Sequence, residues 1–423
     1  MARSRGTLLA LALMLLLVAA VSASTLLPAQ AAQRSRWRPG PIKIAISQSL
    51  LQPQPNIKTD SDVTSAITRA IEAWKNVADI DLVQVTSDRS SVSPTGIAGD
   101  GISLITIAPT AENVSLFKSD VESAAKTRVF VDKRGFISEA DIVLSPFLEF
   151  SSDGSYGTFD LESTIRHEIG HLLGLRHSSV VGSVMYDVAS RNGVFGETGV
   201  VSGALTEDDL SAIRDLYDDG NIPNCCGVVN GKLVGLSKNT SSLELWLQHV
   251  STGKIAAHAS AGPDGAFRFG GIEYGEYEVV ARGLTKSGGR STELLGDVTI
   301  SSSEPVNFAH KAANQPLDFS TELLGKNGIL SDSPLMLHRG TSYSIYIGGR
   351  DLRSDRLRLE AGSPFMSVVG DSLIDMAYDE GVSGIKFTLN IDGRTPPGNY
   401  SICAISLAGS RDCVPGGIVV LTE

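Results

Sequence analysis

The residues with the clearest chemical potential lie in one segment, His167-Glu168-Ile169-Gly170-His171-Leu172-Leu173-Gly174-Leu175-Arg176-His177. On a helix, residues four apart share one face, so the imidazoles of His167 and His171 can bind one metal ion. Gly174 lets the chain leave the helix in a conformation that a Cβ would penalise, and His177 can then return as a third ligand. Three neutral imidazoles leave one tetrahedral position for water, which is typical of a catalytic zinc site. Glu168 lies beside them, where it can take a proton from that water.

A surface or core helix that happens to carry histidines is the alternative explanation of this segment. A single histidine would favour that explanation. Here the pattern H-E-x-x-H-x-x-G-x-x-H fixes five positions at set spacing, which favours a metal site. The segment therefore predicts one catalytic zinc ion held by His167, His171 and His177, with Glu168 as the general base.

The same segment resembles the zinc motif of the metzincin metallopeptidases, which also have a methionine turn downstream. Ser183-Val184-Met185-Tyr186 supplies such a turn. The resemblance implies that Met185 forms an apolar floor beneath the zinc, with ordinary core packing as the alternative. Ser178, directly after the third histidine, and the stretch Leu205–Tyr217 resemble the matrixin group. The likeness covers roughly Arg38–Asp219 and implies an α+β zincin domain, in which a mixed twisted sheet supports the active-site helix.

Three departures from matrixins limit what the resemblance implies. Asp187 stands where matrixins usually have a proline, so we expect a different wall of the specificity pocket. No histidine precedes His167, so we expect no second, histidine-bound structural zinc. No cysteine precedes Cys225, so we expect no latency controlled by a cysteine. Calcium dependence stays open, because no residue pattern specifically supports a calcium site.

The resemblance also implies how substrate binds. We expect an extended protein or peptide substrate to lie antiparallel to an edge strand, and we assign that edge to Arg128–Asp132. The loop Asp187–Ala204 is expected to shape the pocket for the residue after the scissile bond. Tyr186 has two interpretations, stabilisation of the oxyanion or simple packing.

The chain's length and composition set the broad class. The 423 residues are 42% hydrophobic and carry a net charge of −11, which suggests several globular domains and argues against binding to nucleic acid. Arg3 and Arg5 precede the apolar run Leu8–Val21, which predicts a secretory signal peptide cleaved after Ala23 or Ala31. An uncleaved membrane anchor is the alternative, but the run is shorter than the ~20 residues that span a bilayer. We expect a secreted, extracellular protein with no membrane contact after cleavage.

Periodicity divides the remaining chain. Strand-like and helical patterns alternate up to about Asp219, with helices expected over Ser61–Trp74, Leu161–Leu175 and Thr206–Tyr217. Beyond that point short β patterns dominate. The predicted organisation is a multi-domain chain with a signal peptide (1–31), a matrixin-like domain (37–222) and two all-β sandwich domains (223–313 and 314–423).

The two β regions resemble known modules. Cys225–Lys311 is similar to carboxypeptidase-regulatory-like or Cna-B-like sandwiches, and Leu337–Leu352 weakly resembles an immunoglobulin-like module of the IPT/TIG kind. Both regions are candidates for binding a cell-surface or matrix ligand, or for spacing and stabilising the enzyme. Cys403 and Cys413 are expected to pair across a hairpin. Cys225 and Cys226 could pair with each other, stay free or pair between molecules.

These patterns together predict a secreted zinc-dependent endopeptidase of extracellular proteins. The alternative from another class is a secreted adhesin or binding protein with a vestigial peptidase domain. The intact set of Glu168, Met185 and the three histidines favours the enzyme, because a mere scaffold would lose any one of them easily.

Overall fold

The computed structural model describes residues 35–75, 77–78, 80–94, 98–196, 204–218, 220–234, 243–284, 290–311, 317–378 and 381–422. The predicted signal peptide lies outside these residues. Within them, the helices are all too short or too polar to span a bilayer.

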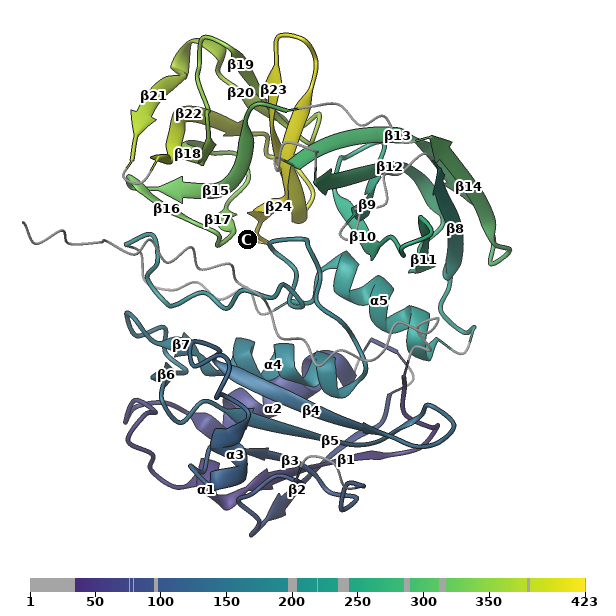
Figure 1. Cartoon of the computed structure of the whole chain (residues 1–423), viewed down its shortest axis with the longest axis vertical. Coiled ribbons are helices and arrows are strands. Elements are labelled where there is room, and N and C mark those ends of the chain that lie inside the picture. Colours follow the sequence, from purple (N-terminus) through teal and green to yellow (C-terminus); the bar gives the residue numbers. More distant parts are fainter. Residues whose placement is uncertain are drawn as a thin grey trace, which may run out of the picture. The chain divides into compact units, whose positions relative to one another are not determined.

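The N-terminal region is built on a mixed five-stranded sheet of order β2-β1-β3-β5-β4 (Figure 1). Its strands are β1 (Ile42–Ser47), β2 (Leu82–Ser87), β3 (Ser103–Thr106), β4 (Ala125–Val131) and β5 (Ile137–Leu144). The first three and β5 run parallel, whereas β4 is antiparallel to β5 and forms one edge. The predicted edge segment therefore lies on an edge strand, which begins three residues earlier than expected, at Ala125.

Two long helices, α2 (Val63–Lys75) and α4 (Leu161–Leu172), pack together beside this sheet (Figure 1). The apolar stripe of α2 is buried as its spacing predicts, and Trp74 Nε1 donates a hydrogen bond of 2.8 Å to the carbonyl of Arg166 in α4. The short elements α1 (Gln48–Leu51), α3 (Ala111–Ser115), β6 (Phe150–Ser151) and β7 (Phe159–Asp160) complete the region with α5 (Glu207–Tyr217).

The helix that carries the histidine motif is shorter than predicted. Asp160 caps its start by accepting a hydrogen bond of 2.7 Å from Ser163 N. It ends at Leu172 rather than Leu175, because Gly174 adopts φ +97°, a left-handed conformation that interrupts the helix.

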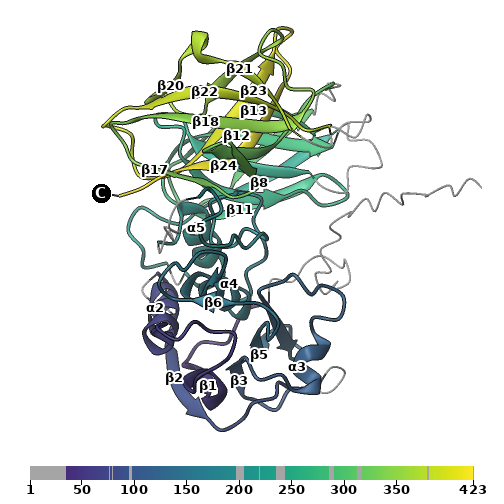
Figure 2. The ribbon, with the colours of Figure 1, turned by 90° about the vertical axis from the view of Figure 1, so that its left-hand side faces the viewer.

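The C-terminal region consists of three sheets (Figure 2). An eight-stranded sheet has the order β10-β9-β12-β13-β24-β23-β19, with β17 paired to β24. A three-stranded sheet has the order β11-β8-β14, and a six-stranded sheet the order β16-β15-β18-β22-β20, with β21 paired to β22. The elements are β8 (Gly227–Val234), β9 (Glu244–His249), β10 (Ile255–Ser260), β11 (Ala266–Ile272), β12 (Gly275–Leu284), β13 (Arg290–Ile300), β14 (Val306–Lys311), β15 (Ser320–Lys326), β16 (Ile329–Ser331), β17 (Leu335–Leu337), β18 (Ser342–Arg350), β19 (Leu357–Ala361), β20 (Met366–Val368), η1 (Gly370–Ser372), β21 (Ile374–Ala377), β22 (Ser383–Ile391), β23 (Gly398–Ser406) and β24 (Arg411–Val420).

Each smaller sheet buries its apolar face against one half of the large sheet. Phe267 and Phe269 of β11 share a core with Leu245, Leu247 and Val279. A second core joins the six-stranded sheet to the other half of the eight-stranded sheet through side chains that include Ile345, Ile347, Phe387, Tyr400 and Ile402. The fold is therefore an α+β region followed by two β-sandwiches, as predicted.

The two sandwiches share a sheet, which the sequence did not predict. Strand β13 of the first pairs with β24 of the second through Thr292 and Arg411. Beside this pair, fully buried Asp412 accepts hydrogen bonds of 2.8 Å from Arg282 Nε and from Thr321 N. The polar cluster joins three strands of the two sandwiches.

All four cysteines are paired in two intrachain disulfides. Cys403 and Cys413 are paired in register on β23 and β24, as expected for a bridge across a hairpin. Cys225 is linked to its neighbour Cys226, which selects one of the three alternatives.

Candidate metal centre

Three histidine side chains converge at α4, because His167 and His171 lie on this helix and His177 follows it in the chain. The ligand atoms of His167, His171 and His177 all lie within 4.8 Å of one another, and the Nε2 atoms of His171 and His177 are 3.0 Å apart. Zinc–nitrogen bonds of about 2.0–2.1 Å in a tetrahedron place ligand nitrogens roughly 3.4 Å apart. The observed nitrogens therefore suit one zinc ion. Among the described residues, this is the only cluster of three metal-binding side chains at such spacing.

Hydrogen bonds to backbone carbonyls orient two of the rings. His167 Nδ1 lies 2.7 Å from the oxygen of Val184, and His171 Nδ1 lies 2.9 Å from the oxygen of Leu175. Because a carbonyl can only accept, each Nδ1 carries the proton, and each Nε2 keeps a lone pair for the metal. Burial, and then the charge of His171, lower the pKa of His167 to about 3. His167 is therefore neutral near pH 7, the form that binds zinc.

Glu168 lies on α4 next to the first ligand, and only 6% of it is exposed. Burial is the main influence on its carboxyl group and raises its pKa, although the charge of His171 and a hydrogen bond from Thr127 Oγ1 oppose that effect. A raised pKa makes the carboxylate a stronger base. Thr127 lies on edge strand β4, and sequence reasoning missed it because only the position of the strand brings it to Glu168.

Met185 packs against α4 between the two helical histidines. A Cβ on Gly170 would lie 2.2 Å from the sulfur of Met185 and 3.1 Å from Trp74 Cζ2. Met185 is 2% exposed and belongs to the same core as Trp74 and Ile169. Gly170 occupies an unspecified position of the H-E-x-x-H pattern, and its lack of a Cβ leaves room for Met185 at this place.

The start of α5 holds the methionine turn. Asp209 accepts hydrogen bonds of 2.6 Å from Ser183 Oγ, 3.0 Å from Val184 N and 3.2 Å from Met185 N. It also closes a capping box with Thr206. Since Val184 supplies the carbonyl for His167, Asp209 positions that ligand indirectly.

The neighbouring acid serves the third ligand. Asp208 accepts a hydrogen bond of 2.6 Å from Ser178 Oγ, next to His177, and burial raises the pKa of Asp208. Acids in the first turn of a helix compensate the helix dipole, and this is the role that Asp208 and Asp209 have by their position in the sequence alone. Their second role depends on tertiary contacts, and no sequence signal beyond the family resemblance pointed to it.

Tyr186 follows the methionine turn, and its ring packs against the second sandwich core. Burial, and then the charges of Asp187 and Asp332, raise its pKa to about 12. These contacts favour the packing interpretation of Tyr186. Of the predicted pocket loop, residues 197–203 lie outside the described residues.

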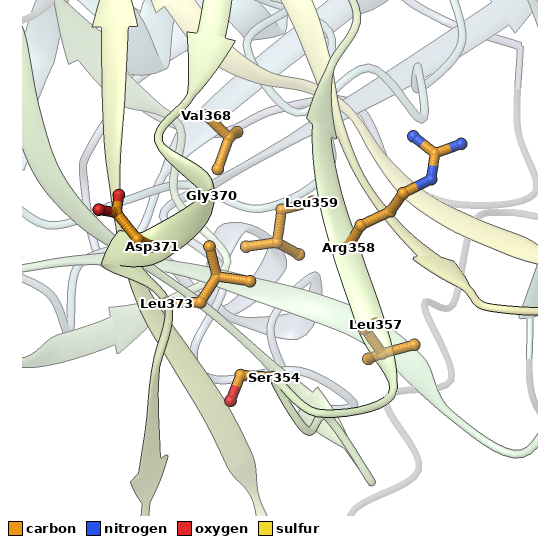
Figure 3. A pocket seen from close by; sticks show the side chains of 8 residues that line it. All are labelled: Ser354, Leu357, Arg358, Leu359, Val368, Gly370, Asp371 and Leu373. Atoms are coloured by element: carbon orange, nitrogen blue, oxygen red, sulfur yellow. The ribbon is translucent and has the colours of Figure 1, made fainter.

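A hollow of about 280 Å³ in the second sandwich is unrelated to the histidine cluster (Figure 3). Leu357, Leu359, Val368 and Leu373 line it, with Arg358 and Asp371 as its charged residues. The cluster of metal-binding side chains lies elsewhere, on α4 and directly after it.

Comparison with known proteins agrees with the metal centre. Residues 118–218 match the family model described as Matrixin. The matched residues include β4, α4, the methionine turn and α5. Metalloendoproteinase 1 of Glycine max is 29% identical over 199 residues, covering 43% of this chain and 52% of that protein. Metalloendoproteinase 2-MMP of Arabidopsis thaliana is 32% identical over 173 residues, covering 40% of each chain. The chain thus has metalloendoproteinase relatives of the matrixin type and carries a histidine triad of the zinc-binding kind, but spans about half the length of these relatives.

Solved structures give only distant likenesses. The major pilin subunit BcpA of Bacillus cereus is 14% identical with a TM-score of 0.15, covering 47% of this chain and 70% of that chain. A putative adhesin from Bacteroides ovatus is 10% identical with a TM-score of 0.18, covering 46% of this chain and 87% of that chain. At such scores neither likeness bears on function.

Proposed function

We propose that this chain is a secreted zinc-dependent endopeptidase that hydrolyses peptide bonds of extracellular proteins. The observation that carries the proposal is the convergence of His167, His171 and His177 beside the buried carboxylate of Glu168. The ring nitrogens have the spacing and the protonation that zinc requires.

Zinc bound at this centre would supply Lewis acidity, activating water and polarising the carbonyl of the scissile bond. The chain's own residues supply the proton transfers. Glu168 would accept a proton from the attacking water and deliver it to the nitrogen of the departing amine. Thr127 would hold the Glu168 side chain through the hydroxyl that donates to it. Met185 would provide the apolar floor, since its sulfur packs against α4 between the two helical ligands.

Substrate would bind in extended form along β4. This strand is an edge of its sheet, so it offers unpaired backbone groups for an added antiparallel strand. Val129 and Val131 of the same strand are exposed, at 38% and 43%, and would contact substrate side chains. Because β4 also carries Thr127, a peptide on this edge would lie beside Glu168.

We propose that the predicted divisions at 37–222, 223–313 and 314–423 mark the functional regions. Export is supported by the signal-like sequence at the N-terminus and by the two disulfides, because disulfides persist mainly in oxidising compartments. A cell-surface or matrix ligand for the β-sandwiches remains part of this proposal.

Proteolysis of an unfolded protein substrate by the full zinc-loaded chain tests the proposal. We expect cleavage that a zinc chelator abolishes and that added zinc restores. Glu168→Ala should lower the rate by about 10²–10⁴-fold without releasing zinc, because this carboxylate is the base and not a ligand. Glu149→Ala is the matched control, since Glu149 is an exposed glutamate paired with Lys58.

If neither the zinc-loaded wild type nor Glu168→Ala cleaves the substrate, the proposal is contradicted. That result would support a binding protein with a vestigial peptidase domain. Cleavage that persists in Glu168→Ala would point to a contaminating protease.

A further inference from the structure

The segment 178–196, which follows the third histidine, is anchored in the second β-sandwich. Val181 and Phe195 are each 8% exposed, and both belong to the buried core formed otherwise by residues 317–420. Tyr186 and Val194 pack against the same core. Val181 and Phe195, near the two ends of the segment, are therefore buried in the core of the second sandwich. Because protein cores are closely packed, this burial restricts the movement of the segment.

Hydrogen bonds tie the same segment to the sandwich. Asn327 Nδ2 donates to the oxygen of Phe195 at 2.9 Å, from the turn between β15 and β16. The hydroxyls of Ser190 and Ser333 lie 2.6 Å apart, and Val181 N donates to the oxygen of Pro415 at 2.9 Å. These contacts join loop to loop and fix both side chains and backbone.

The two backbones approach too closely to admit additional atoms. A Cβ on Gly182 would lie 2.5 Å from Val419 Cγ2, and a Cβ on Gly416 would lie 2.4 Å from Val180 Cγ1. Val180 is fully buried in a small core with Trp246 and Val280 of the first sandwich. The segment is thus seated in a fitted interface with both sandwiches.

Within the same segment, Arg191 and Asn192 contact the N-terminal α+β region. Asn192 N donates to the oxygen of Thr158 at 2.8 Å, and Gly157 N donates to the oxygen of Asn192 at 2.9 Å. The guanidinium of Arg191 lies 4.4 Å from the ring centre of Phe159. Residues 186–196 therefore bridge the connector before α4 and the second sandwich, and a displacement of either partner would move them.

We propose that the second β-sandwich is a working part of the peptidase site, in which Asn327 and Ser333 are positioning residues for the loop 186–196. Through this loop they determine which substrate side chain is accepted after the scissile bond. The inference rests on the proposed endopeptidase function and on the expected role of the loop as a pocket wall. It differs from a spacer role, because a spacer would leave the substrate preference unchanged.

Asn327→Asp in the full zinc-loaded chain is the decisive variant. Asn327 has φ 55°, and aspartate tolerates this left-handed conformation, but its carboxylate would face the oxygen of Phe195 without a proton to donate. Asp351→Asn is the matched control, an exchange between the same two residue types at another left-handed position, φ 53°, in the same sandwich. Cleavage of a peptide set that differs only after the scissile bond, zinc content and hydrogen exchange of residues 186–196 are measured for both.

We expect Asn327→Asp to change the ratio of kcat/KM between preferred and disfavoured peptides by about five- to tenfold, mostly through KM. Hydrogen exchange of residues 186–196 should accelerate, with zinc content unchanged, while Asp351→Asn behaves as wild type. Unchanged peptide ratios and unchanged exchange would overturn the inference. An equal loss of kcat for all peptides, or loss of zinc, would also overturn it, because the contact would then support the metal centre or the fold. Exchange is measured without turnover, so this readout remains valid if the chain is not a peptidase.

Discussion

The N-terminal α+β region and the C-terminal β region both bury carboxylates, but the carboxylates have different partners. Asp208 and Asp209 at the start of α5 accept hydrogen bonds from serine hydroxyls and backbone amides next to the histidines. Asp412, which is 0% exposed, instead pairs with the guanidinium of Arg282 and bonds to Thr321. The first pair of acids holds a turn in a particular geometry, whereas the third joins two sandwiches.

The difference shows how a buried charge can serve either function or assembly. Amides and hydroxyls are directional donors, so a carboxylate bound to them specifies the position of the backbone. In a buried arginine–carboxylate pair, each group depends on the opposite charge of the other. Loss of one member therefore leaves an uncompensated charge in the interior. We therefore expect that loss of the buried acid in the C-terminal region mainly lowers the free energy of unfolding. Loss of an acid at the start of α5 should mainly lower the affinity for zinc.

The largest effect should come from Asp412→Ala. Removal of this carboxylate leaves the Arg282 guanidinium buried without its counter-charge, which should lower the free energy of unfolding by about 3–5 kcal/mol. Denaturant titration of the full chain measures it. The exposed pair of Asp392 and Arg394 provides the control, and Asp392→Ala should leave the unfolding midpoint unchanged. Similar losses in both variants would contradict the special role of the buried pair.

Asp209→Asn should act on the metal centre instead. An amide nitrogen in place of either oxygen would face the donors of the methionine turn and displace Val184, the partner of His167. Zinc affinity should fall by about ten- to a hundredfold, measured by competition with a coloured chelator. Asp215→Asn, on the same helix, changes a contact to Arg268 and should leave zinc affinity intact. Unaltered affinity in Asp209→Asn would show that the turn needs no such support.

Gly170→Ala tests the packing of Met185 on the helix. Alanine is favoured in helices by roughly 1 kcal/mol, but its Cβ would overlap the sulfur of Met185, and overpacking costs about 1–3 kcal/mol. We expect a small net loss of thermal stability together with weaker zinc binding. Gly370→Ala, where a Cβ meets nothing within 4 Å, serves as the control. A stabilised Gly170→Ala would mean that Met185 can move aside.

The smallest effect concerns pH and links the two regions. The ring of His258 on β10 forms a hydrogen bond of 2.6 Å with Glu244 and lies near Asp208. Burial by itself lowers the pKa of His258. The two acids outweigh that effect and raise the pKa of His258 above 6.5. The stabilisation is therefore complete below pH 6.5 and is lost as pH rises through the raised pKa. Thermal unfolding between pH 6 and pH 9 should show a decline on the order of 1 kcal/mol that His258→Gln lacks. A decline of the same size in His258→Gln, or its absence in the exposed control His338→Gln, would refute the assignment.

The metal centre was largely readable from the sequence, because its chemistry depends on local spacing. His167 and His171 are one helical turn apart, so a helix alone brings them together. His177 needs only the turn at Gly174. Thr127, by contrast, is 41 residues from Glu168 in the chain, and only the placement of edge strand β4 beside α4 unites them.

The sequence by itself determined the kinds of elements, the three ligands and the hairpin disulfide, since each follows from residues close together in the chain. The tertiary structure decided that Asp208 and Asp209 support the ligands, that the two sandwiches share one sheet through β13 and β24, and that the loop after Met185 is seated in the second sandwich. Periodicity shows that a face is buried, but it does not name the partner. Partners are selected by the packing of distant segments, which depends on the shape and size of all the side chains at once.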